Sequence, residues 1–137
     1  MTHSRHHRFR TEDGQTAVEF ALLAPVLIAL LLGIVQGGLA FHNYITVTDA
    51  ARAAARQAIL ARVGGITVTQ VTQTAQGAAA DLNRANLGVV VADPLDPTFN
   101  HAGSTLTVTV TYPYSINILG VVVSSGNLTS TMTGRLE

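Results

Sequence analysis

The chain has 137 residues and a mass of 14.4 kDa, which is room for one small domain and too little for a two-domain enzyme. Charged residues make up 12% of it and hydrophobic residues 47%, whereas roughly 25% of an ordinary soluble domain is charged. The formal net charge is +0 and the basic residues, all Arg, are scattered, which disfavours nucleic-acid binding. Because the chain has 0 Cys, disulfides, thiol nucleophiles and Cys-based metal sites are excluded.

The first elements are a polar leader and an apolar helix. Residues 1–14 hold three Arg and three His, then two acids and Gly14, without an apolar period. Residues 20–41 carry no formal charge and, as a helix, would span about 33 Å, the thickness of a bilayer's hydrocarbon core. This stretch is longer than the apolar region of a secretory signal peptide, so we expect a retained transmembrane helix.

The helix is expected to continue beyond the apolar stretch. Residues 42–63 are rich in Ala, contain no Gly or Pro, and place apolar side chains at three- and four-residue spacing. That apolar stripe consists of Tyr44, Val47, Ala51, Ala55, Ala58 and Ile59. The pattern predicts one helix over about 15–63, roughly 70 Å long, with Gly64 and Gly65 as its C-cap and an amphipathic outer half.

The rest of the chain, 64–137, predicts a small exoplasmic α+β domain. A second helix is expected over about 68–85, on a stripe of Val71, Ala75, Ala78, Ala79 and Leu82, with Gly88 as its cap. Strict alternation predicts a strand over 105–112, and shorter strands are expected over 87–92 and 128–133. The expected turn residues are Pro94, Pro97, Asn100, Gly103, Pro113, Gly120 and Gly126.

These elements predict an α+β fold in which a long N-terminal transmembrane helix continues into an amphipathic spine packed on a small antiparallel sheet. We expect the strand face Leu106, Val108, Val110 and Tyr112 to rest on the outer helix near Val47, Ala51, Ala55 and Ile59. So small a domain without disulfides needs that cover. The contact is expected to hold the domain at the end of a rigid rod.

The junction between leader and helix carries the candidate chemistry. Glu19 stands at the edge of the apolar stretch, where an acid costs free energy and is a functional candidate by default. If the chain were cut after Gly14, the new α-amine of Gln15 would lie about one helical turn from Glu19. In a helical array that amine could form an ion pair with the Glu19 carboxylate of a neighbouring subunit.

These residues resemble a known family. Gly14, followed five residues later by Glu19-Phe20 and an apolar stretch with Pro25 early in it, resembles the class III prepilin-peptidase site and anchor of TadE-like pseudopilins of tight-adherence (Flp-type) pili. The segments TLTVTVTYPY and NLTSTMTGRLE are similar to the strand pair that ends many such chains.

The resemblance implies cleavage between Gly14 and Gln15, and assembly through Glu19 with Phe20 beside it. It implies prepilin peptidase, other pilin and pseudopilin subunits and a pilus assembly platform in the membrane as partners. The expected location is the inner membrane, with the C-terminal domain outside, or within or at the end of extracellular pili. Arg5, Arg8 and Arg10 also favour a cytoplasmic leader.

Function is expected to be structural. The chain has no motif of a hydrolase, zinc protease, nucleotide-binding loop or dinucleotide-binding fold, so it is not expected to be an enzyme or to bind a cofactor or metal. The leader's His residues lack the carboxylates of a metal site. Asp93 and Asp96 fit Asp-Pro turns, with calcium binding left open.

Several alternatives remain at this stage. Pro25 could kink a membrane helix without further meaning, and Gly33 and Gly37 fit a helix-packing motif that chance also produces. The chain could instead be an uncleaved single-pass membrane protein with a ligand-binding or regulatory outer domain, or a secreted domain. Because major Flp-type subunits resemble a bare helix, the size of the outer domain favours a minor, priming subunit.

Overall fold

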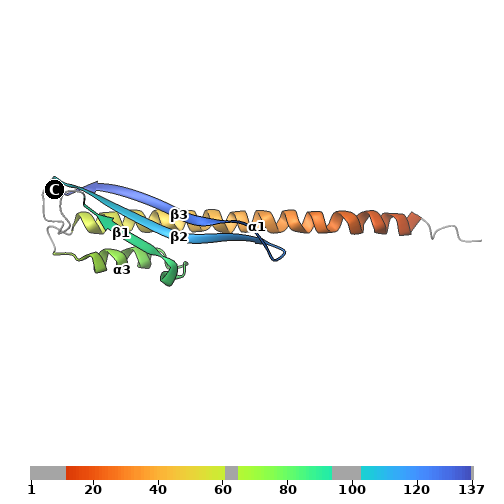
Figure 1. The fold of residues 1–137 in the computed structure, drawn as a ribbon, viewed down its shortest axis with the longest axis horizontal. Helices are drawn as coiled ribbons and strands as arrows, with labels where there is room; N and C mark the ends of the chain where they lie inside the picture. The colour runs from red at the N-terminus through yellow and green to blue at the C-terminus, as the bar shows by residue number, and fades with distance from the viewer. Residues whose placement is uncertain (1–11, 61–64, 94–102, 137) are drawn as a thin grey trace, which may run out of the picture.

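The computed structural model describes residues 12–60, 65–93 and 103–136 (Figure 1). In chain order they form helix α1 (Glu12–Ile59), helix α3 (Val68–Ala78), the 3₁₀ turn η1 (Arg84–Asn86) and strands β1 (Gly88–Ala92), β2 (Thr105–Ile118) and β3 (Val121–Arg135). The expected α+β fold, a long apolar helix followed by a small antiparallel sheet, is confirmed.

Helix α1 has 48 residues and is about 72 Å long at roughly 1.5 Å per residue. It begins at Glu12, so it includes the last residues of the expected leader, and it ends at Ile59, short of the expected end. Residues 1–11 and 61–64, among them Gly64, lie outside the described residues, while Gly65 has the positive φ of 63° expected of a residue after a helix.

The three described strands pair in the order β1-β2-β3, all antiparallel. Strands β2 and β3 are longer than expected and form a hairpin whose turn is Leu119-Gly120, both with positive φ. Pro113 and Gly126, expected in turns, lie inside these strands. Pro113 is tolerated because β1 pairs with β2 only as far as Thr111, which leaves β2 an edge strand there.

Gly126 lies within β3, with an aromatic ring of the paired strand against it. A Cβ at this position would lie 3.2 Å from Cε1 of Tyr114, its pairing partner on β2. Gly120 and Gly103 are the turn residues that the sequence predicted, each with positive φ. The other expected turn residues, at 94, 97 and 100, lie outside the described residues.

The second helix is shorter than expected. Helix α3 starts with a capping box, in which Thr67 accepts from the main-chain N–H of Gln70, and it ends at Ala78. The rest of the expected helix is a turn followed by η1. Of the expected stripe only Ala78 is exposed. Gly88 belongs to β1 and is not a helix cap: a Cβ there would meet Thr111 Oγ1 at 2.5 Å.

The core lies between the outer half of α1, the sheet and α3. Helix α1 contributes mostly alanines, whose small side chains let the strands and α3 approach its backbone closely. The expected contact is confirmed for the buried residues Leu106, Val108, Val110, Val47, Ala51 and Ala55. Tyr112 is half-buried, Ile59 lies against Gly134, and Tyr44, expected in the helix stripe, is exposed.

The sheet lies beside the helix and does not stand at its end. Figure 1 shows β2 and β3 running back along α1 to about its middle, with α3 and β1 next to its outer part. At the far end of the hairpin, Gln36 Oε1 accepts a 2.7 Å hydrogen bond from the main-chain N–H of Asn117, and Gln36 Nε2 donates to the Asn117 carbonyl. The expected packing of the sheet on the outer part of the helix is thus confirmed, and the hairpin reaches further inward than expected, to Gly33 and Gln36.

Candidate assembly site on the long helix

The expected cleavage and assembly residues lie on the first two turns of α1. Gly14 to Phe20 are all helical and exposed, and nothing in the described chain lies within 4 Å of a Cβ built on Gly14. The Gly14–Gln15 peptide bond therefore lies within the first turn of the helix. Whether it is cleaved is not tested by this arrangement and stays a prediction.

Glu19 has a partner that the sequence argument did not anticipate. Gln15 Nε2 donates a 3.1 Å hydrogen bond to Glu19 Oε1 along the exposed face of the helix. The sequence prediction concerns only the α-amine of Gln15, which exists after cleavage. The four-residue spacing of an amide and a carboxylate is the signal that could have predicted this pair.

The segment 14–41 of α1, called here the inner segment, is covered by almost nothing. Except for Leu32, which is half-buried, its large apolar side chains have exposed fractions from 51% at Ile28 to 71% at Leu22. It contains the one helix stretch in the described chain that is long and apolar enough to cross a membrane, and none of that window is buried. Side chains of this kind require lipid or other helices around them.

Pro25 and the two glycines of the expected helix-packing motif lie on this inner segment. Pro25 is inside α1 and exposed, where its missing N–H leaves the carbonyl of Ala21 without its helical donor. A Cβ at Gly33 would lie 3.7 Å from Ile118 Cδ1 of the hairpin, whereas Gly37 has open space. Gly33 thus faces the chain's own sheet, and packing between subunits through Gly37 stays a prediction.

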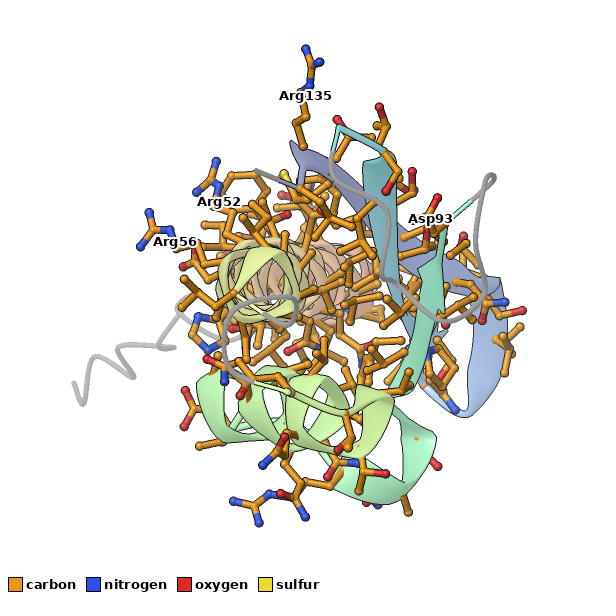
Figure 2. The ribbon with its side chains drawn as sticks, turned by 90° about the vertical axis from the view of Figure 1, so that its left-hand side faces the viewer. Arg52, Arg56, Asp93 and Arg135 are labelled. Carbon is orange, nitrogen blue, oxygen red and sulfur yellow. The ribbon has the colours of Figure 1, made fainter. Side chains whose placement is uncertain are left out.

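Residues 42–59 of α1, called here the outer segment, carry the charges. Asp49 and Arg52 form an exposed ion pair of 3.1 Å, and His42 Nε2 lies 3.9 Å from Asp81 Oδ2. Figure 2 looks along α1 from its outer end and shows Arg52 and Arg56 pointing away from α3 into solvent. Together these charges mark the outer segment as the water-facing half of the helix.

The remaining candidate residues are Asp93 and Asp96, for which calcium binding was left open. Asp93 Oδ2 accepts a 2.6 Å hydrogen bond from Ser104 Oγ, which ties the end of β1 to the start of β2. Asp96 lies outside the described residues, so calcium binding by the pair is untested. Within 12–60, 65–93 and 103–136 no group of three or more His, Cys, Asp or Glu is placed to hold a metal ion.

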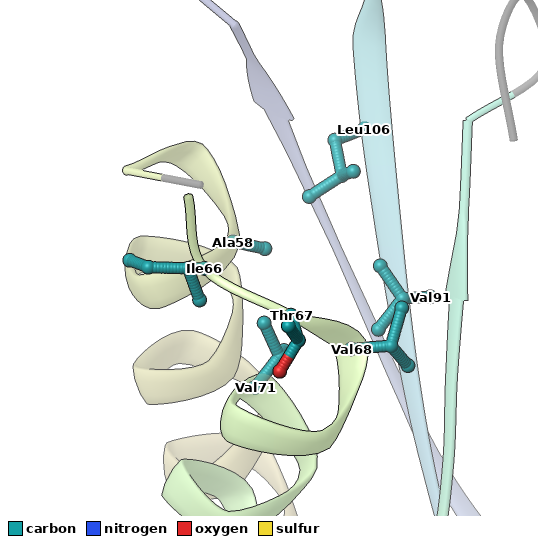
Figure 3. Close-up of a pocket in the computed structure, with 7 residues that line it drawn as sticks. All are labelled: Ala58, Ile66, Thr67, Val68, Val71, Val91 and Leu106. Atoms are coloured by element: carbon teal, nitrogen blue, oxygen red, sulfur yellow. The ribbon is translucent and has the colours of Figure 1, made fainter. Parts of the chain in front are cut away.

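A small apolar pocket opens between the end of α1, the start of α3 and the sheet (Figure 3). Its lining consists of Ala58, Ile66, Thr67, Val68, Val71, Val91 and Leu106. Thr67 supplies its one hydroxyl, and that oxygen already caps α3. The pocket therefore presents no titratable group for acid–base chemistry.

In the described residues one helix is long and apolar enough to cross a membrane, and it is exposed on its inner segment and packed against a small sheet on its outer segment. This arrangement indicates a single-pass membrane protein with an α+β fold. Residues 14–56 match the family described as TadE-like protein. The segment that holds Gly14, Glu19 and the membrane span is thus TadE-like, as the resemblance implied, and TadE-like proteins are associated with Tad pili. The search of curated proteins and the search of solved structures each found no match.

Proposed function

We propose that this chain is a minor pilin-like subunit that primes or supports the assembly of Flp-type adhesive pili, with a structural and not a catalytic role. In this proposal prepilin peptidase removes residues 1–14 at the cytoplasmic face of the inner membrane. The outer domain lies outside, and α1 then packs with other pilin and pseudopilin subunits on the membrane assembly platform.

The observation that carries the proposal is the uncovered inner segment inside a TadE-like match. Most large apolar side chains of this segment are exposed in the isolated chain, so in this proposal lipid covers them before assembly and neighbouring helices cover them afterwards. Glu19 is the only charged residue between Gly14 and His42. In that apolar setting a carboxylate gains from an opposite charge, and the Gln15 amine of the cut chain is the nearest one.

The pair Glu19→Gln and Glu19→Ala tests this role. Gln keeps a side-chain oxygen that can accept from Gln15 but removes the charge, whereas Ala removes both. We expect both variants to be cleaved normally and, as the only copy in the cell, to fail to support piliation. Wild-type piliation with Glu19→Gln would refute the ion pair, and wild-type piliation with Glu19→Ala would refute an assembly role for this residue.

The size of the outer domain supports the role of a minor subunit. The hairpin, α3 and β1 all lie beside the helix, so every subunit of a thin filament would need room for them along its length. We expect deletion of the chain to abolish piliation although the protein is rare or absent in purified pili. Quantitative mass spectrometry of sheared pili measures this stoichiometry, and finding the chain as the dominant filament protein would make it a major pilin.

A further inference from the structure

The tip of the β2–β3 hairpin, residues 115–125, is apolar, uncharged and exposed. Leu119, Val121, Val122 and Val123 have exposed fractions from 57% to 67%, values like those of the inner segment of α1. No Asp, Glu, Lys or Arg occurs anywhere between Gly103 and Gly134. No packing contact within the described residues accounts for such an apolar patch at the end of the hairpin.

The position of the tip along α1 explains the patch. Near the outer end, Gly134, which pairs with Leu106, lies against Ile59, and near the inner end Ile118 lies against Gly33. Between these contacts α1 rises about 39 Å at roughly 1.5 Å per residue, and β2 advances about 40 Å at roughly 3.3 Å per residue. Helix and hairpin therefore advance by the same distance along the axis of α1 between these two contacts.

This level comparison places the tip inside the apolar zone. By the same rises, the half-buried Tyr114 is level with about residue 42 of α1, near the exposed aromatic side chains of Phe41 and Tyr44. Aromatic residues at one level are typical of a membrane–water boundary, and the pair His42 and Asp81 stands on its watery side. Ile118 then lies roughly 13 Å below that boundary.

Two features set how deep the tip can go. Because β1 pairs with β2 only as far as Thr111, the hairpin beyond it is a two-stranded ribbon with open edges, which hydrocarbon does not tolerate. The register shift at Ile116/Asn117 interrupts the ladder, and there Gln36 satisfies both the N–H and the carbonyl of Asn117. The ribbon thus fits the boundary between headgroups and acyl chains, where water and headgroups supply partners for its edges.

We propose that this hairpin tip is a second membrane contact, which inserts between lipid headgroups and upper acyl chains of the leaflet on the domain's side. It fixes the rotation and height of the outer domain relative to the bilayer while α1 supplies the anchor. This inference rests on the membrane-spanning role of α1 in the proposed function, and the test below separates the two.

The chain contains no Trp, so single-Trp variants report without background. The probe is Val122→Trp at the tip, with Thr129→Trp on the same strand as the matched control above the boundary and Leu27→Trp as the control in the span. All three sites are exposed in the isolated chain. The full-length variants are reconstituted in phosphatidylcholine and phosphatidylglycerol vesicles, and quenching by aqueous iodide is compared with quenching by lipids spin-labelled at a shallow or a deep acyl carbon.

We expect Trp fluorescence of Val122→Trp to lose iodide quenching and to be quenched most by the shallow label. Leu27→Trp should be quenched most by the deep label, and Thr129→Trp by iodide alone. If Val122→Trp behaves like Thr129→Trp while Leu27→Trp stays in the acyl chains, the hairpin contact is overturned and the anchor stands. Protection of Val122→Trp from iodide and from both lipid labels would show a protein neighbour at the tip and overturn the lipid contact. Iodide quenching of Leu27→Trp would remove the anchor and the hairpin contact together.

Discussion

The two halves of α1 are one continuous helix built for two surroundings. The outer segment uses alanines, five of which are buried, so the sheet and α3 can approach its backbone. The inner segment carries Leu, Ile, Val and Phe side chains that are more than half exposed. The two halves therefore differ in side-chain size. Residues are small where the chain packs on itself, and large where other molecules are expected to pack against the helix.

The largest effect is expected from a charge placed under the sheet. Val108 is 0% exposed between the outer segment and the strands, so Val108→Asp buries a carboxylate without a partner and should cost about 4 kcal/mol or more. Thermal unfolding of the detergent-solubilised protein measures the loss. Val90→Asp, the same change at a 61% exposed strand position, is the matched control and should stay near wild type; equal losses in both would contradict the assigned core.

A second test puts the same enlargement into both halves of the helix. Ala54→Leu has no room, because Ala54 is 0% exposed, and should destabilise the outer domain by about 1 to 3 kcal/mol. Ala21→Leu, on the exposed inner segment, should leave the unfolding midpoint unchanged. A stable Ala54→Leu variant would mean that the alanine stripe is not closely packed.

A smaller effect is expected at the contact between Gln36 of the inner segment and the hairpin. Gln36→Leu removes both hydrogen bonds to Asn117 and should cost about 1 kcal/mol, felt locally at the tip. Hydrogen exchange should accelerate at the Asn117 amide and remain unchanged at the Thr109 amide, which lies where β1 also covers β2. Unchanged exchange at Asn117 would argue that Gln36 does not hold the hairpin.

The smallest effect should come from the surface of the outer segment. Asp49 and Arg52 are both 57% exposed, so water and salt screen their 3.1 Å ion pair. Asp49→Asn should therefore change the free energy of unfolding by less than about 0.5 kcal/mol, as measured by urea titration. A loss comparable to that of Ala54→Leu would show that the pair is part of the packed half of the helix.

Sequence periodicity predicted the elements whose pattern is local and strong. The apolar stretch predicted the inner segment, and the alternation from Leu106 to Tyr112 predicted the strand face and the helix surface under it. The predicted strands were too short, because Pro113 and Gly126 favour turns by propensity. In the folded chain a free strand edge accommodates the first, and the ring of Tyr114 covers the second.

The position of the hairpin beside the helix could not be predicted, because it depends on tertiary contacts between residues about eighty positions apart. The hydrogen bonds between Gln36 and Asn117, for example, join residues that no local pattern relates. Within the candidate site, the spacing of Gly14 and Glu19 was evident from the sequence. The hydrogen bond from Gln15 to Glu19 depends on the rotamers of two exposed side chains, which the sequence does not determine.

Intact-mass analysis of the chain extracted from membranes with active prepilin peptidase tests whether the leader is removed. We expect a chain shortened by residues 1–14 and beginning at Gln15, and a Gly14→Val variant that stays uncut. A further loss of ammonia would show that Gln15 has cyclised and no longer offers an amine to Glu19. Full-length protein alone would contradict processing and favour an uncleaved single-pass membrane protein with a ligand-binding or regulatory outer domain.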